Sequence, residues 1–333
     1  MVLPSALAAR KTLDADLAVT LAAAEWEWRG MTGDVAGSWG TVGPRLTSVV
    51  SKGQLRAATH GTQAVAPILA EQGLPGEAVA TFNPASLAGV ASDGRSLGTL
   101  LALGAEKMRD SLDNGVLLGP ASRLGWEFVE KAVATQVADA FRVAMGAQGV
   151  ATKSATLFVR VVNPGACSRC VVLAGVRSGS LDAFKRHPSC RCVNIPTSEN
   201  IPGFMGTDPV EYFKSLSEKE QDLTFTKAGA QAIRDGADLN QVVNARRGMS
   251  STVDGAQKRL IRDSRGLYTT TEGMSRRGYA HHVMSRQPGW SVQVGDSVNR
   301  RKVTRARLMP ESIYEIAGSR SEAISMLKAY GYF

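Results

Sequence analysis

Cysteine is absent from residues 1–166 and from residues 193–333, so any thiol chemistry of this 333-residue chain is confined to the 26 residues between them. The sequence also has no run of 18 apolar residues, and we therefore expect no membrane-spanning helix. Aromatic residues make up only 6% of the chain, whereas alanine and glycine are abundant, which favours closely packed helices over a β-sandwich. Residues 1–14 contain Arg10 and Lys11 but no following apolar core or cleavage site. We therefore expect no secretory signal and a reducing cytoplasm, in which structural disulfides are disfavoured.

Acidic side chains are scarce in one part of the chain, and this scarcity produces its net charge of +9. Residues 1–160 hold 14 basic and 14 acidic side chains, whereas residues 246–307 hold 14 basic and 4 acidic ones, a local charge of +10. Such a block is typical of proteins with a phosphate-rich partner, although a solvated surface or a patch facing an acidic protein has the same composition. The candidate nucleic-acid contacts are Arg246, Arg247, Lys258, Arg259, Arg262, Arg276, Arg277, Arg300, Arg301, Lys302, Arg305 and Arg307.

The first 150 residues are predicted to be mostly α-helical. Trp26 and Trp28 lie two residues apart and so cannot share one face of the first helix. The last helix is the clearest, because its apolar residues recur every three or four positions. A glycine-rich stretch from residue 30 to residue 43 is expected to end the first helix. Helices are expected over residues 5–30, 44–72, 97–112 and 121–148.

The pattern changes after residue 155. The β-branched run 156–162 predicts a strand, residues 171–173 and 193–195 predict two short extended pieces, and residues 175–179 predict a loop. Residues 196–209 have the composition of a linker. Further helices are expected over residues 208–220, 226–235, 310–316 and 321–330, the last capped by Ser319 or Ser321. The chain is therefore predicted to be mainly α, with a small α+β module stapled by a metal and a basic, partly extended C-terminal region.

The four cysteines form the string Cys167-Ser-Arg-Cys170, followed by His187-Pro-Ser-Cys190-Arg-Cys192, which also holds one of only four histidines. The Cys-x2-Cys pair places two thiolates on one tight turn, and the His-x2-Cys-x-Cys run offers a second half-site. Structural zinc takes four such ligands in a closed tetrahedral site. We therefore expect a structural Zn²⁺ ion held by Cys167, Cys170, His187 and Cys192, with Cys190 as the alternative to Cys192. Such an ion would staple a loop-rich segment, so loss of Cys167 or Cys170 is expected to unfold residues 155–195.

Other interpretations of the cluster stay open. Four cysteines can be buried as small apolar residues, although clustering at ligand spacing argues against this. A redox Cys-x-x-Cys normally precedes a helix in a thioredoxin-like unit, whereas a β-branched run follows here. A catalytic Cys–His pair would need a third, orienting residue, and none stands out. A catalytic zinc would use three ligands and an open position, whereas a cysteine-rich set favours the closed kind.

The order CSRC, sixteen residues, HPSCRC resembles the signature of the phage Mu F-like family of minor head proteins. In that family the signature follows a helical segment and a short strand, an order that residues 121–164 reproduce. The similarity covers about residues 100–195, and residues 228–249 and 309–333 resemble extensions carried by members from phages of actinobacteria. The expected segments are a helical N-terminal region (1–95), a Mu F-like module (96–196), a linker with helices (197–245) and a basic C-terminal extension (246–333).

The resemblance implies a role in assembly rather than in chemistry. Members of the family are minor capsid or head-morphogenesis proteins of tailed phages. The expected partners are therefore the portal protein, the major capsid or scaffold protein and, through the basic block with its interleaved aromatics, packaged double-stranded DNA bound without sequence preference. The expected location is the virion, inside the capsid near the portal, after a stage in the host cytoplasm.

Two alternatives are a non-specific DNA-binding zinc protein and an effector enzyme, such as a toxin or protease fusion, carried in the head. Ser275 with His281 or His282 could be assembled into a triad, but no nucleophile elbow surrounds them. No enzymatic activity is therefore expected.

Overall fold

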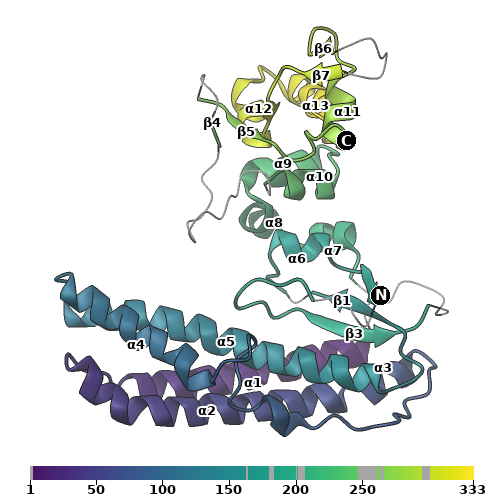
Figure 1. Cartoon of the computed structure of the whole chain (residues 1–333). Helices are drawn as coiled ribbons and strands as arrows, with labels where there is room; N and C mark the ends of the chain where they lie inside the picture. Colours follow the sequence, from purple (N-terminus) through teal and green to yellow (C-terminus); the bar gives the residue numbers. More distant parts are fainter. Residues whose placement is uncertain are drawn as a thin grey trace. The chain divides into compact units, whose positions relative to one another are not determined.

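Residues 3–162, 164–179, 184–199, 201, 207–246, 261–262, 266–294 and 301–333 are described by the computed structural model, residues 261 and 262 through their backbone only. Their contacts form two compact units, Met1–Ala166 with Ala174–Thr207 and Cys167–Leu173 with Asp208–Phe333. The described residues are mainly helical with small antiparallel sheets, which confirms the mainly α prediction (Figure 1). None of the helices in these ranges is both long and apolar enough to cross a membrane.

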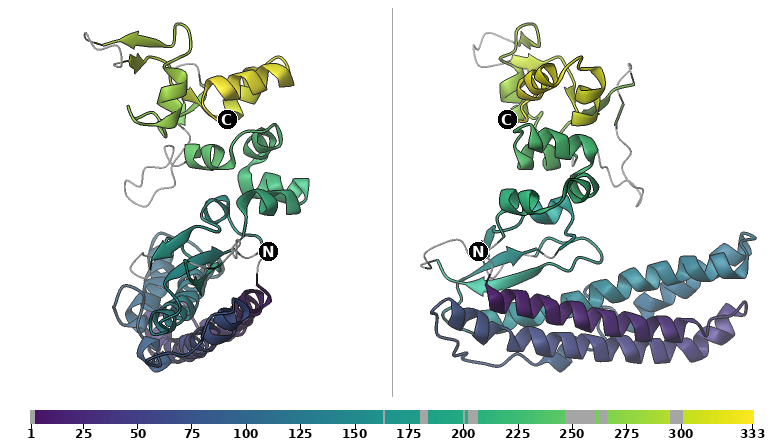
Figure 2. Two further views of the ribbon diagram at one scale, coloured as in Figure 1. Left: turned by 90° about the vertical axis from the view of Figure 1, so that its right-hand side faces the viewer. Right: turned by 180° about the vertical axis from the view of Figure 1, so that it is seen from behind.

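Four long helices of the first unit lie side by side around one apolar core (Figures 1 and 2). Leu17, Leu46, Leu101 and Phe141 each contribute a fully buried side chain to this core, one from each helix. The helices are α1 (Pro4–Trp28), α2 (Val35–Gln63), α4 (Leu97–Asp113) and α5 (Leu118–Val150), with α3 (Val65–Glu71) and a 3₁₀ turn, η1 (Pro84–Leu87), between α2 and α4.

Glycine allows the helix backbones to approach closely. A Cβ atom on Gly61 of α2 would lie 2.3 Å from the Phe141 carbonyl oxygen of α5. A Cβ atom on Gly125 of α5 would lie 2.7 Å from the Gly104 carbonyl oxygen of α4. Both distances are shorter than van der Waals contact, so no larger residue fits at either crossing without a shift of the helices. The abundance of small residues thus has the structural role that the composition suggested.

The helices of this unit match the sequence pattern, with one clear difference. Trp28 is 3% exposed and Trp26 is 70% exposed, as their spacing predicted. The glycine-rich stretch was expected to delay the second helix to residue 44, but α2 begins at Val35. The prediction was wrong because the Asp34 side chain accepts a hydrogen bond from the Gly37 amide and caps the helix early. Pro44 lies inside α2 rather than at its start.

A three-stranded antiparallel sheet completes the first unit. β1 (Leu157–Val161) lies between β2 (Arg177–Gly179) and β3 (Val193–Thr197), and Val159 pairs with Arg177 on one side and Ile195 on the other. β1 and β3 confirm the strands predicted at 156–162 and 193–195. The loop predicted at 175–179 was partly wrong, because β2 pairs with β1 there. The linker predicted over residues 196–209 was also partly wrong, because its first two residues belong to β3.

The sheet is fixed to the helices by apolar and polar contacts. The valines of β1 and β3, together with Ile195, belong to the same core as the four long helices. At the end of α3, the Gln72 amide donates to the Pro196 carbonyl (2.8 Å) and accepts from the Thr197 hydroxyl (2.7 Å). The strands that flank the cysteine segment therefore rest on a rigid helical base.

The second unit is built from short helices and strands. The helix predicted over 208–220 is divided in two at Ser217, which forms a capping box with Glu220. Ser319 caps the last helix, as predicted. The helices are α6 (Ser168–Val172), α7 (Pro209–Ser215), α8 (Glu218–Phe225), α9 (Lys227–Arg234), α10 (Leu239–Ala245), α11 (Tyr279–Met284), α12 (Pro310–Ile316) and α13 (Arg320–Ala329). The strands are β4 (Ile261–Arg262), β5 (Tyr268–Thr270), β6 (Ser291–Gln293), β7 (Arg301–Val303) and β8 (Arg307–Leu308).

The described part of the basic region is folded around its own apolar core. Val242, Met284, Ile313 and Leu327 meet there with Tyr332, close to the end of the chain. Residues 266–294 and 301–333 contain both short strands and helices, and α12 and α13 confirm the helices predicted over 310–316 and 321–330. Apolar residues far apart in the sequence supply the core, and a composition rich in Gly, Ser and Thr does not indicate that packing.

Candidate metal centre

The first half-site is the turn that opens α6. Cys167 is the residue before the first helical position, with extended backbone angles, and Cys170 lies within the helix. This corrects the extended conformation predicted for residues 171–173, because Val171 and Val172 are helical. One helical turn brings positions three apart onto the same side of the helix. The Cys-x2-Cys spacing thus places both thiols together, as a shared ion requires.

The second half-site is a tight turn between Phe184 and β3. The Cys190 amide donates to the His187 carbonyl oxygen (3.2 Å), which closes the turn. Ser189 adopts a left-handed backbone conformation, with φ of 61°, which is uncommon for a residue with a side chain. Its amide donates to the hydroxyl of Thr135 on α5 (2.9 Å). A helix of the rigid base therefore holds the turn in a conformation that it would not adopt easily alone.

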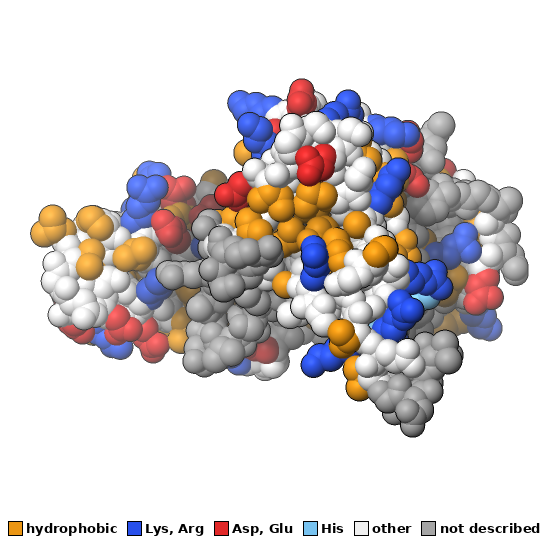
Figure 3. Space-filling model, turned by 90° about the horizontal axis from the view of Figure 1, so that it is seen from above, with side chains coloured by type: hydrophobic (Ala, Val, Ile, Leu, Met, Phe, Trp, Pro, Cys, Tyr) orange, Lys and Arg blue, Asp and Glu red, His pale blue; other side chains and the backbone are white. Residues whose placement is uncertain are grey.

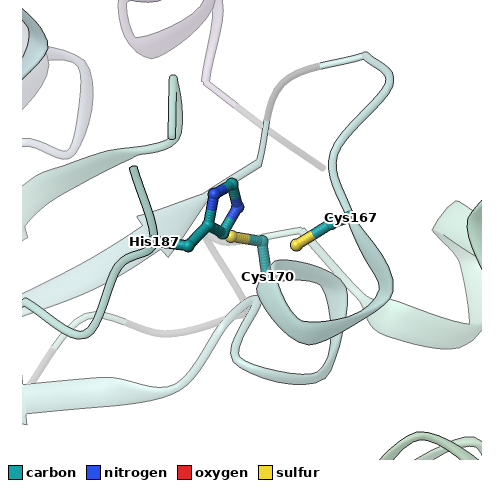
Figure 4. Close-up of side chains that lie close together, drawn as sticks. All are labelled: Cys167, Cys170 and His187. Atoms are coloured by element: carbon teal, nitrogen blue, oxygen red, sulfur yellow. The ribbon is translucent and has the colours of Figure 1, made fainter. Parts of the chain in front are cut away.

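The Cys and His side chains form two overlapping groups that share Cys170. Cys167, Cys170 and His187 form one, and Cys170, Cys190 and Cys192 form the other; in each, the ligand atoms lie within 4.8 Å of one another. Neighbouring ligands of a tetrahedral zinc with Zn–S bonds of about 2.3 Å lie about 3.8 Å apart. Figure 4 shows the Cys167 and Cys170 sulfur atoms on the side of the turn that faces the His187 ring. Each group of three lies at distances close to those that one ion needs, but no group of four among the described residues meets the same limit. The structure therefore brings the expected ligands Cys167, Cys170 and His187 together and places Cys192 near Cys170 alone of these three.

The chemistry of the donors suits a closed site. None of the four cysteines is in a disulfide, and Cys170, Cys190 and Cys192 are buried while Cys167 is half-buried. The Nδ1 atom of the exposed His187 lies 2.7 Å from the Pro188 carbonyl oxygen, which leaves Nε2 as the nitrogen that could bind an ion. Both Cys190 and Cys192 lie close to Cys170, so the choice between them as fourth ligand stays a prediction.

One argument against a redox centre at Cys167 and Cys170 does not hold in the structure, but a second argument against it does. A helix does follow Cys167, contrary to the expected β-branched extended run. The sheet beside it is antiparallel throughout its described strands, however, so it contains no parallel βαβ unit of the thioredoxin type. Two more buried cysteines within ligand distance of Cys170 favour metal binding over a two-cysteine redox centre.

A buried ion pair on α5 supports the second half-site, and sequence reasoning missed it. The Arg142 guanidinium donates to the carbonyl oxygens of Cys190 (2.8 Å) and Cys192 (3.2 Å). Its other terminal nitrogen donates to the carboxylate of Asp139, and both side chains are at most 10% exposed. Asp139 also accepts hydrogen bonds from Arg186 and from the Ser92 hydroxyl. The sequence did contain a signal for this pair, because Asp139 and Arg142 are oppositely charged and stand three positions apart among the apolar residues of the helix predicted over 121–148.

Arg142 has two effects on the turn. Its hydrogen bonds fix the backbone on both sides of Arg191, so the Cys190 and Cys192 thiols keep one direction. Its positive charge lies close to a site where three or four thiolates around Zn²⁺ would leave a net negative charge. The Phe184 ring packs against the guanidinium groups of Arg142 and Arg160, at 5.3 and 3.8 Å from its centre.

Two of the predicted nucleic-acid residues have internal roles instead. Arg307 is fully buried, donates to the carbonyl oxygens of Glu272, Tyr330 and Gly331, and stacks on the Tyr332 ring. Burial lowers the pKa of Arg307 and raises the pKa of Tyr332 to about 12. Arg246 is ion-paired with Glu311 and donates to Thr226. The prediction is wrong for Arg307, because its side chain has no exposed surface with which to contact DNA. For Arg246, whose side chain is 30% exposed, it stays a prediction.

The other predicted contacts divide into three groups. Arg276, Arg301 and Lys302 are exposed and line one hollow together with His281. Arg277 is exposed outside this hollow, and Arg305 packs over the Trp290 ring. Arg247, Lys258, Arg259 and Arg300, and the side chain of Arg262, lie outside the described residues.

No family model, curated protein or solved structure matches this chain. The triad considered for Ser275 gains no support from the described residues, where no hydrogen bond joins its side chain to His281 or His282. The cysteine and histidine cluster is therefore the arrangement on which a functional proposal can rest.

Proposed function

We propose that this protein binds one structural zinc ion through its cysteine and histidine cluster and acts as a non-enzymatic minor head protein of a tailed phage. The observation that carries the proposal is the gathering of all five Cys and His residues of the CSRC and HPSCRC motifs. The motifs that resemble the Mu F-like signature are thus the residues that come together in space. A helix and a strand precede them, in the order that the resemblance requires.

The ion in this proposal has a structural rather than a catalytic role. Three of the thiols are buried, so a metal bound to them has little access to water or substrate. Cys167, Cys170 and His187, with Cys192 or Cys190 as the fourth ligand, close the coordination shell and leave no open position. The residues hold the two loop segments together, and the metal supplies the bonds between them.

Metal analysis of protein purified under reducing conditions tests the first half of the proposal. We expect one zinc per chain, and Cys170→Ser should abolish binding because Cys170 belongs to both groups. His187→Ala should weaken zinc binding, because it removes an expected ligand. His282→Ala is its control and should keep its zinc, because His282 is exposed and lies outside the cluster. Substitution by Co²⁺ then counts the thiolate ligands from the intensity of the sulfur-to-cobalt charge-transfer bands. Reduced protein without stoichiometric zinc would reject the metal site.

The assembly role requires a separate experiment. We expect the protein to co-purify with the portal protein after nuclease treatment, and to crosslink to portal inside purified virions. Crosslinks to major capsid or scaffold protein, without any to portal, would place the protein in the head away from the portal. Its absence from virions and from assembling heads would reject the head-protein assignment while leaving the zinc site intact.

A second candidate function, which can coexist with the first, is non-specific binding of double-stranded DNA. The observation that favours it is the group of exposed cations Arg276, Arg301 and Lys302 around one hollow of the C-terminal unit. Binding of this kind depends on neutralising phosphates and weakens steeply as salt rises. A full-length protein that fails to bind duplex DNA at low salt would reject this candidate.

A further inference from the structure

A hollow of about 430 Å³ opens on the C-terminal unit between the turn before α11, the first turns of α11 and the β6–β7 ribbon. Three of its described lining residues are Lys or Arg, three are apolar and one is a histidine. On the face of the molecule seen in Figure 3, a group of Lys and Arg side chains lies beside a histidine. Its lining residues are Met274, Arg276, His281, Val294, Arg301, Lys302 and Val303.

The charge of this hollow is of one sign. Among the residues that the structure describes, no acidic side chain belongs to the lining and none forms an ion pair with Arg276, Arg301 or Lys302. This differs from Arg246 and Arg320, whose charges are met by Glu311 and Asp235 within the same unit. The hollow therefore collects positive charge with which no acidic side chain in the described part of the unit pairs.

The backbone positions these cations from two directions. Arg301 is the first residue of β7, opposite Gln293 of β6, and one of its terminal nitrogens donates to the Ser285 carbonyl oxygen after α11 (3.1 Å). His281 lies one helical turn before Ser285, on the same side of α11. Its amide donates to the Gly273 carbonyl oxygen, which holds the turn that carries Arg276 against the helix (2.9 Å). Two separate elements thus meet around one space.

We propose that this hollow is a phosphodiester-binding subsite that grips the backbone of double-stranded DNA. The inference rests on the second proposed function, DNA binding, and names the residues that carry it. Arg276, Arg301 and Lys302 contact phosphate oxygens, His281 donates a further hydrogen bond, and the apolar side chains of Met274, Val294 and Val303 face the sugar. None of these residues reads a base edge, so the contact has no sequence preference.

The experiment compares two full-length triple variants with the same loss of charge. The subsite variant carries Arg276→Ala, Arg301→Ala and Lys302→Ala. The control carries Arg286→Ala, Lys219→Ala and Lys328→Ala, three exposed residues that lie outside the hollow and outside the predicted nucleic-acid contacts. Binding to a mixed-sequence duplex is measured by fluorescence anisotropy over a series of salt concentrations, and thermal unfolding checks that both variants fold.

We expect the subsite variant to lower affinity at low salt at least about tenfold more than the control. If each cation contacts one phosphate, the slope of log affinity against log salt becomes shallower by about 2.7. The single variants Arg276→Ala and Arg286→Ala form a second matched pair. They keep the comparison valid if removal of the Arg301 hydrogen bond to Ser285 destabilises the triple variant.

Three results would overturn the inference, and they differ in what they remove. Equal losses in both variants would show a diffuse basic surface and reject the subsite alone. Wild-type protein that binds no duplex would reject both the DNA-binding function and the subsite. Inorganic phosphate that shifts the NMR signals of residues 274–281 in protein that does not bind duplex would assign the hollow to a small free anion instead.

Discussion

The β1–β3 strand pair and the two cysteine segments lie next to each other in the sequence, but different forces hold them. Val159, Val161, Val193 and Ile195 are buried in the apolar core that the four long helices share. The described residues of the cysteine segments, 166–173 and 184–192, contribute nothing to that core. The second of these segments is tied to α5 by hydrogen bonds from Arg142 and to Thr135. A bound ion would therefore order the two cysteine segments and leave the strands as they are.

The sequence led us to expect that a metal ion holds the whole of residues 155–195 in its fold. That expectation assumes that the whole segment is too small to bury enough apolar surface by itself. The strands, however, share the apolar core of the long helices, and β3 contacts both α5 and α3, the second of which lies more than 100 residues earlier in the sequence. The proposed metal is then needed only for the two segments on either side of β2.

The largest expected effect is the loss of the helical core on which the strands rest. Phe141→Ala removes a fully buried ring and should lower the free energy of unfolding by about 3–5 kcal/mol, with β1 and β3 unfolding together with the helices. Val143→Ala on the same helix is the control, because Val143 is 50% exposed and should change stability by about 0.5 kcal/mol or less. Thermal denaturation combined with hydrogen exchange measures both. Strands that keep their protection while the helices unfold would contradict the shared core.

Arg142→Ala should have the next largest effect, because it removes a buried ion pair within α5 and the hydrogen bonds from α5 to the second cysteine segment. The substitution leaves two carbonyl oxygens without a donor and removes a buried partner of Asp139, at a cost of about 3 kcal/mol. It should also weaken zinc binding. Arg142→Lys keeps the positive charge but cannot make the several hydrogen bonds of the guanidinium group, so its zinc affinity should lie between those of the wild type and Arg142→Ala. Arg123→Ala is the control, since Arg123 lies on α5 with an 82% exposed side chain. Unchanged zinc affinity in Arg142→Ala would show that Arg142 stabilises the helix without positioning the turn.

Removal of the ion should have a smaller and local effect. With a chelator, or in Cys170→Ser, residues 166–173 and 184–192 should lose hydrogen-exchange protection while β1 and β3 keep theirs. The loss of overall stability should be smaller than in Phe141→Ala. Ser168→Ala, which changes α6 without removing a ligand, is the control. Loss of protection in β1 and β3 would instead support a staple for the whole 155–195 segment.

The features that sequence reasoning found are those encoded by neighbouring residues. The 3.6-residue pattern of α5, the Ser319 cap and the β-branched run of β1 all depend on residues within a turn or a strand. The cysteine spacing likewise indicated the gathering of the five Cys and His residues, because two residues between thiols correspond to one turn of chain. Local patterns therefore gave the helices of the first unit and the position of the candidate site.

The features that it missed depend on contacts between distant residues. Val171 and Val172 favour strands in isolation, yet they are helical in α6, since context overrides so weak a preference. Arg307 was taken for a surface cation, although the carbonyl oxygens that surround it come from Glu272 and from residues near the end of the chain. Arg142 is 48 residues from Cys190, so only the three-dimensional structure joins them. In each case the decisive partner lies outside the window in which a sequence pattern can be recognised.

The smallest expected effect concerns the backbone of Ser189, whose left-handed conformation turns the chain between His187 and Cys190. Ser189→Gly should keep or slightly raise zinc affinity, because a residue with a Cβ atom costs about 1 kcal/mol more than glycine in this conformation. Ser189→Val should lower zinc affinity by up to about tenfold, since a β-branched side chain tolerates a positive φ least. Competition with a chromophoric chelator measures both affinities. Because neither variant removes a ligand or touches the strands, a difference between them isolates the geometry of the turn. Equal affinities would mean that the ion itself, rather than α5 and the preformed turn, sets the direction of the second half-site.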